Sequence, residues 1–239
     1  MRSRLALSTA FILAFLTLPA CRSASESTGP ENSSPEIIVS STPPFQTREP
    51  ARYRATRTIT VTTSNGEKSV TTTLLAKDGE LRRSESDGMV YLESPQGSFV
   101  LLADNNVYAD LAGETSRGSV QDGEPFEISP EGLLHSDVNH TTSYQKLGTE
   151  MIDGRDANKY RVVVNSASGG SVSVSETLIW IDGDLNMPVK SETRSAAGAL
   201  VSMQLSEISL EVDKTVFQIP GGYEKVTFSE FQKRLKKTE

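Results

Sequence analysis

The sequence contains one cysteine, two histidines and one tryptophan among its 239 residues. The single cysteine, Cys21, has no partner for a disulfide within the chain, and two histidines give little material for a metal centre. A basic excess is also absent, because 24 Lys and Arg stand against 31 Asp and Glu, for a formal net charge of −7. We therefore expect no nucleic-acid partner.

No apolar run reaches the roughly 20 residues that a membrane-spanning helix needs. The apolar run Leu5–Leu18 follows two arginines and ends in a proline and an alanine just before Cys21. This order of a basic start, a short apolar core and a small-residue end is typical of a cleaved export signal. Residues 1–20 are therefore predicted to be a signal peptide.

The stretch "LPAC", which ends at Cys21, resembles the lipobox of bacterial lipoproteins, whose cysteine becomes the acylated first residue. The alternatives are a free thiol and an intermolecular disulfide. Two or more acyl chains would give a stable membrane anchor, where a single chain is marginal. Residue 22 is Arg and not Asp, which by the same resemblance implies the outer membrane, with the protein facing the periplasm.

Composition divides the rest of the chain into three parts. Residues 21–50 are rich in Ser, Pro and Glu and are predicted to be a disordered tether. Residues 51–226 alternate apolar and polar positions between turn signals such as Asn65-Gly66, Asp87-Gly88 and Asp153-Gly154, which predicts roughly ten antiparallel strands. Residues 112–144 interrupt this rhythm as a long loop, with a helical turn predicted at Ser129–Leu134.

Residues 227–239 are predicted to form a short amphipathic helix. Thr227 and Glu230 have the spacing of a capping box, and Phe228, Phe231 and Leu235 share one face. The helix is expected to dock on the domain, and contact with a membrane surface is the alternative.

The stretch "LIWIDGDLNMPVKSETR" (178–194) raises the question of a calcium loop. Asp182, Asp184 and Asn186 match the first ligand positions of an EF-hand, but Met187 replaces its glycine and Thr193 its bidentate glutamate. We predict a hairpin turn and no metal.

The stretch "HSDVNH" holds both histidines, His135 and His140, and could contribute to a metal site or to a hydrolase triad. No HExxH helix, GxSxG elbow or phosphate loop accompanies it. We therefore predict that the protein is not an enzyme and has no cofactor, and a hydrolase that uses His135 is a distant alternative.

The second half of the chain resembles the LolA-like superfamily of periplasmic lipoprotein carriers, receptors and envelope sensors. The order of "YQKLGTEMIDGRDANKYRVVV", "ETLIWID", "MPVKSETR" and "ISLEVDKTVFQIPGGYEKV" over residues 144–226 carries this resemblance. It implies a mainly β fold: a strongly curved antiparallel sheet, or half-open barrel, with one or two short helices and an apolar concave cavity that binds acyl chains. The family's long first helix is missing here, so a lid must come from Ser129–Leu134, from the tail helix, or be absent.

Alternation along the strands predicts one continuous apolar face as the ligand site. Its proposed members are Val162, Val174, Leu178, Trp180, Met203 and Leu205. The resulting hypothesis is a lipid-anchored envelope protein that binds an apolar ligand, an acyl chain or a lipidated partner, as an acceptor or a sensor. The alternative is a structural or protein-interaction lipoprotein whose sheet is filled by its own side chains.

Overall fold

Tight hairpin turns set the positions of the strands. At Asp87-Gly88 and Asp153-Gly154 both residues have positive φ, at 51° and 74° and at 49° and 77°. This is the turn geometry whose twist matches two antiparallel strands, and Asp-Gly is one of the few pairs that adopts it at low cost. The turns that the sequence predicts at these positions are confirmed.

The computed structural model describes residues 37–39, 42–112, 139–168, 171–195 and 197–236, all of which belong to one compact unit, Pro35–Glu239. The first half of the chain forms β1 (Ile37–Val39), β2 (Arg52–Thr62), β3 (Lys68–Asp78), β4 (Leu81–Ser86), β5 (Met89–Ser94), β6 (Gly97–Leu102), a 3-10 turn η1 (Ala103–Asn105) and β7 (Val107–Asp110). The second half forms β8 (Asn139–Ile152), β9 (Arg155–Ser168), β10 (Ser171–Asp182), β11 (Pro188–Arg194), β12 (Leu200–Ser209), η2 (Lys214–Phe217), β13 (Glu224–Val226) and α1 (Phe228–Leu235).

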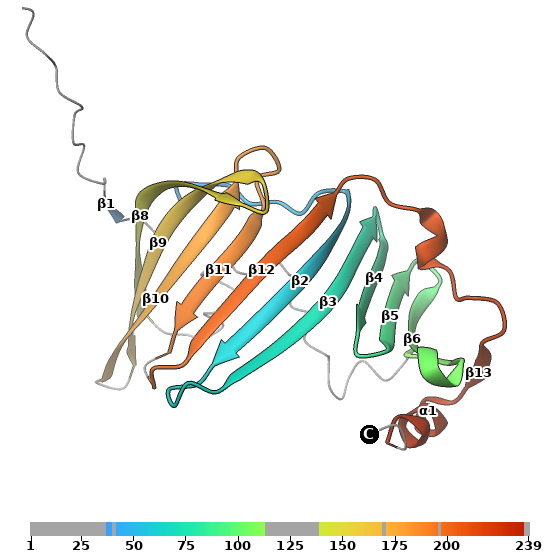
Figure 1. Cartoon of the computed structure of the whole chain (residues 1–239). Coiled ribbons are helices and arrows are strands. Elements are labelled where there is room, and N and C mark those ends of the chain that lie inside the picture. Colours follow the sequence, from blue (N-terminus) through green and yellow to red (C-terminus); the bar gives the residue numbers. More distant parts are fainter. Residues whose placement is uncertain (1–36, 40–41, 113–138, 169–170, 196, 237–239) are drawn as a thin grey trace, which may run out of the picture. The chain divides into compact units, whose positions relative to one another are not determined.

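The described strands form a single sheet in the order β1-β8-β9-β10-β11-β12-β2-β3-β4-β5-β6-β7-β13 (Figure 1). Two series of hairpins, β2 to β7 and β8 to β12, join where β12 pairs with β2. All pairs are antiparallel except β13 with β7, which the sequence did not predict. The sheet curves strongly and does not close, since β1 and β13 end the order. The predicted mainly β, half-open fold is confirmed.

Strand register assigns every residue to one of two faces, because directly paired residues lie on the same side of a sheet. We define the inner face by one row of paired residues that crosses five neighbouring strands: Tyr160, Ile179, Ser191, Met203 and Ile59. The outer face is the opposite side.

The segment Thr42–Pro50 crosses the inner face. Phe45 packs on Tyr144 of β8 and Tyr160 of β9, with ring centroids 5.9 and 4.7 Å apart, and four residues later Glu49 binds Arg82 of β4. In the strand order β9 and β4 are six strand spacings apart, which is about 29 Å across a flat sheet. The four residues from Phe45 to Glu49 span at most about 14 Å of backbone. A sheet that curves toward the segment fits this crossing, which runs behind the strands in Figure 1.

The predicted tether over residues 21–50 is therefore too long. Ile37–Val39 pairs with β8, and Thr42–Pro50 is packed on the sheet. Both an apolar residue, Phe45, and a polar one, Glu49, bind the sheet from this region, so composition alone overestimated the disorder. The predicted loop over residues 112–144 is likewise too long, because β8 begins at Asn139.

The tail helix α1 starts as predicted, with the Thr227 hydroxyl accepting the backbone N–H of Glu230. Its Phe231 is buried against Val100 and Val107, which register places on the inner face of β6 and β7. The helix thus covers the edge of the inner face, far along the strand order from Trp180. The other predicted lid, residues 129–134, lies outside the described residues.

Candidate functional site

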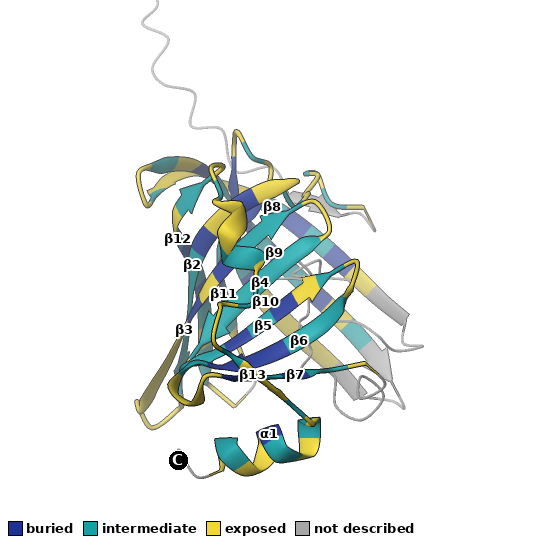
Figure 2. Cartoon of the chain, turned by 90° about the vertical axis from the view of Figure 1, so that its right-hand side faces the viewer, coloured by how far each residue is buried: buried dark blue, intermediate teal, exposed yellow. Residues whose placement is uncertain are grey.

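The inner face holds many of the buried apolar side chains of the sheet, together with the buried polar residues Thr73, Thr177 and Ser191. Its buried apolar members include Tyr53, Ala55, Leu75, Tyr160, Val162, Val164, Ile179, Ile181, Met203 and Leu205. Burying a side chain of this size contributes roughly 1.5–3 kcal/mol each, so this face holds much of the core. Figure 2 shows the burial along the strands.

One end of the inner face is closed and the other is partly exposed. Near the start of β2, Tyr53 is buried beneath the crossing segment. At the far end of the same strand Val61 is half-buried and its partner Val201 is 40% exposed. Exposed apolar side chains continuous with a buried apolar surface are typical of an entry for an apolar ligand.

The six residues that the sequence proposed as one ligand-binding face are split between the two faces, so that prediction is wrong. Register places Val162, Met203 and Leu205 on the inner face, and Val174, Leu178 and Trp180 on the outer face. Alternation within each strand was read correctly, but it cannot say which face of one strand continues onto the next.

A signal for the correct pairing was present at the β9–β10 hairpin. Only two residues separate Ser168 from Ser171, and these two serines are paired. Counting back from a two-residue turn puts Tyr160 opposite Ile179, and it therefore puts Trp180 on the other face. The inner face thus continues from Tyr160 through Ile179, a residue that the predicted site does not include.

Trp180 belongs to a charged cluster on the outer face. Its ring lies 4.8 Å from the ammonium of Lys159 and 4.4 Å from that of Lys190, and its Nε1 donates to the Glu150 carboxylate at 2.7 Å. Lys159 also donates to Glu150 at 2.6 Å. The indole is 2% exposed, so these contacts satisfy its polar edge and leave no surface for an apolar ligand.

A buried ionic cluster fixes the crossing segment to the sheet. The Glu49 carboxylate accepts hydrogen bonds from Arg82 at 2.9 and 2.6 Å, from Tyr53 at 3.0 Å and from Lys77. Burial by itself would raise the pKa of Glu49, but the bonds from Arg82 and Lys77 outweigh it and hold this pKa below its usual value. Burial and the neighbouring Glu49 raise the pKa of Tyr53.

The stretch 178–194 forms the predicted hairpin turn. The Asp182 carboxylate, 1% exposed, accepts the backbone N–H groups of Asp184 at 2.9 Å and Leu185 at 2.7 Å, and it pairs with Arg155. Burial would raise the pKa of Asp182, but the Arg155 and backbone hydrogen bonds leave it lowered. The aspartate therefore closes the turn and joins it to β9.

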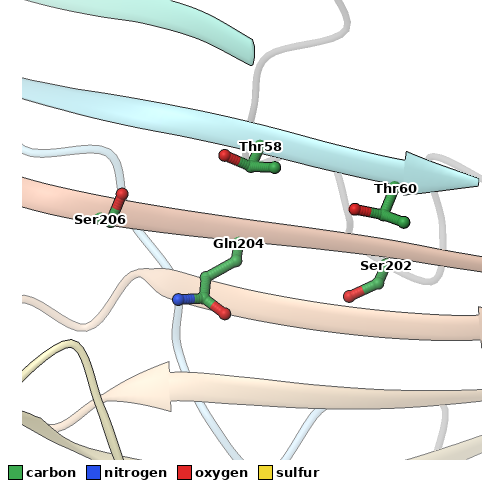
Figure 3. Close-up of a pocket in the computed structure, with 5 residues that line it drawn as sticks. All are labelled: Thr58, Thr60, Ser202, Gln204 and Ser206. Carbon is green, nitrogen blue, oxygen red and sulfur yellow. The ribbon is translucent and has the colours of Figure 1, made fainter. Parts of the chain in front are cut away.

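A shallow depression of about 210 Å³ lies on the outer face over β2 and β12 (Figure 3). It is lined by Thr58, Thr60, Ser202, Gln204 and Ser206. Cross-strand pairing of Thr58 with Gln204 and of Thr60 with Ser202 accounts for the row of hydroxyl and amide groups. This surface has the composition expected of a strand face turned toward water.

Several features singled out in the sequence lie outside the described part: the signal peptide, Cys21 and His135. His140 lies in β8. Within the described residues, no group of three His, Cys, Asp or Glu side chains is placed to hold a metal ion. None of the helices in that part is long and apolar enough to cross a membrane.

No family model matches the chain, and no curated protein matches it in sequence. Among solved structures it is similar to a LolA superfamily protein from Nitrosomonas europaea, with 12% identity over 72% of this chain and 92% of that one and a TM-score of 0.31. It is also similar to the hypothetical lipoprotein YmcC from Escherichia coli, with 14% identity, coverage of 67% and 85%, and a TM-score of 0.28.

A third similar structure is that of MucB in the Pseudomonas aeruginosa MucA/MucB complex. It shares 17% identity with this chain over 74% of this chain and 58% of the other, with a TM-score of 0.33.

Proposed function

We propose that this protein is a lipid-anchored component of the bacterial envelope that binds an apolar ligand, or the acyl part of a lipidated partner, on the inner face of its sheet. The role is binding and not catalysis. The observation that carries the proposal is the apolar inner face, which is buried under Thr42–Pro50 at one end and partly exposed at Val61 and Val201 at the other.

The proposal is tested with an uncharged apolar probe, N-phenyl-1-naphthylamine, and the unit Pro35–Glu239, which holds all the described strands and α1. We expect saturable binding at micromolar probe and co-purifying lipid in native mass spectra. Val201→Glu places a charge at the exposed end of the inner face and should weaken probe binding at least tenfold, because a carboxylate loses solvation beside an apolar ligand.

Ser202→Glu is the matched control, since it adds the same charge to the neighbouring residue on the outer face. It should leave probe binding unchanged. Probe binding that is absent from the wild-type unit, with only lipid-free protein in native spectra, would leave the alternative function: an interaction lipoprotein whose inner face is filled by its own side chains.

Membrane attachment is predicted to depend on Cys21. The substitution Cys21→Ser removes the thiol that would carry the diacylglycerol, and we expect the protein to move from the membrane fraction to the soluble periplasmic fraction. Fractionation followed by immunoblotting measures the shift. A variant that stays with the membrane as fully as the wild type would rule out acylation at this residue as the anchor.

A further inference from the structure

Arg57 lies in the middle of the inner face. Register pairs it with Leu205 of β12 and Thr73 of β3, and Ala55 and Ile59 are its neighbours on the same side of β2. Leu205 is fully buried, Ala55 is 5% exposed and Thr73 is 6% exposed. The sequence pattern of β2 puts a permanently charged guanidinium among apolar side chains.

This guanidinium has no counterion in the described part of the chain. Its Nε is enclosed by protein and makes no hydrogen bond there, and none of the described acids forms an ion pair with Arg57. Two other basic groups of the inner face, Lys77 and Arg82, both bind Glu49. Arg57 as a whole is half-buried, but its enclosed Nε has no acceptor there. A buried donor without an acceptor is costly, so its place in an apolar surface favours an anionic partner.

We propose that the inner face binds an amphiphile with one anionic head, a carboxylate or a phosphate, that pairs with Arg57. The planar fork of a guanidinium matches both of these head groups. The acyl chain lies along the apolar rows toward Val61 and Val201, about 13 Å away at the strand rise of β2. This inference rests on the proposed function and specifies the chemistry of its ligand.

The test compares cis-parinaric acid with its methyl ester, two fluorescent probes that share the acyl chain and differ in the charge of the head. The wild-type Pro35–Glu239 unit should bind the acid about tenfold more tightly than the ester. Arg57→Gln should abolish this preference by weakening acid binding about tenfold while leaving ester binding unchanged. Arg57→Lys should retain part of the preference.

Arg54→Gln is the matched control, because Arg54 lies on the same strand but is exposed and on the outer face. It should leave both affinities unchanged. Thermal melting checks the fold: Arg57→Gln removes an unpaired charge, so its melting temperature without ligand should equal or exceed that of the wild type. A melting temperature several degrees lower would show a structural partner for Arg57 and overturn the inference.

Other outcomes separate this inference from the proposed function. Equal binding of acid and ester by the wild type would overturn the role of Arg57 and leave apolar binding intact. Displacement of parinaric acid by millimolar acetate or inorganic phosphate would show a site for free anions and overturn the amphiphile. Failure of both probes, and of the uncharged probe above, would remove the proposed function and this inference with it.

Discussion

Asp182→Ala is expected to lower the free energy of unfolding by about 3 kcal/mol, because it leaves Arg155 without its buried partner and two turn amides without an acceptor. Chemical denaturation of the Pro35–Glu239 unit, followed by circular dichroism, measures the loss. The turn between β10 and β11 is the element that should weaken first.

Asp184→Ala is the control for this substitution, since its side chain is 95% exposed and its nearest approach to Arg155 is 4.0 Å. A change within about 0.5 kcal/mol is expected there. Equal effects of Asp182→Ala and Asp184→Ala on the free energy of unfolding would mean that the hydrogen bonds of the Asp182 carboxylate do not stabilise the turn. Asp182→Asn keeps an acceptor for the amides but loses the charge, so its effect should lie between those of Asp182→Ala and the control.

Glu49→Ala is expected to cost about 2 kcal/mol and to release the segment Thr42–Pro50 from the inner face. The substitution removes the carboxylate that Lys77 and Arg82 share, and the Lys77 side chain, 14% exposed, is left without that acid. Hydrogen exchange gives a local measurement, because the backbone N–H of Arg48 donates to Asn186 at 2.9 Å and should exchange faster once the segment is free.

Glu80→Ala provides the comparison, since Glu80 is an exposed acid at the turn between β3 and β4. It should change neither the stability nor the exchange of Arg48. Protection of the Arg48 amide that is the same in Glu49→Ala and in the wild type would mean that aromatic packing of Phe45, and not the ionic cluster, holds the segment.

Acid should destabilise the fold through the same two carboxylates. The pKa values of Asp182 and Glu49 are lowered in the folded state, so their contribution to stability is complete above the unfolded-state values of about 3.9 and 4.3. It is lost as the pH falls below these values, because the unfolded chain then binds more protons. The double variant Asp182→Asn, Glu49→Gln should show a flatter loss of stability between about pH 5 and pH 3.

Local features could be predicted from the sequence because they depend on neighbours along the chain. The Asp-Gly turns need positive φ at both positions, the Thr227 cap needs only its own first turn, and alternation identified the strands and the curved-sheet class. Asp182 was placed in a turn because Met187 and Thr193 break a calcium loop. These inferences do not depend on contacts with residues that are distant in the sequence.

Tertiary structure alone decided which residues form the candidate site. A shift of one residue in pairing exchanges the two faces of a strand, so alternation within β10 could not say whether Trp180 or Ile179 continues from Tyr160. The partners of Glu49 and the enclosure of the Arg57 Nε without an acceptor likewise depend on strands that are distant in sequence and adjacent only in the folded sheet. Sequence fixes the alternation of each strand, but long-range pairing chooses the face on which each side chain acts, because only pairing relates one strand to the next.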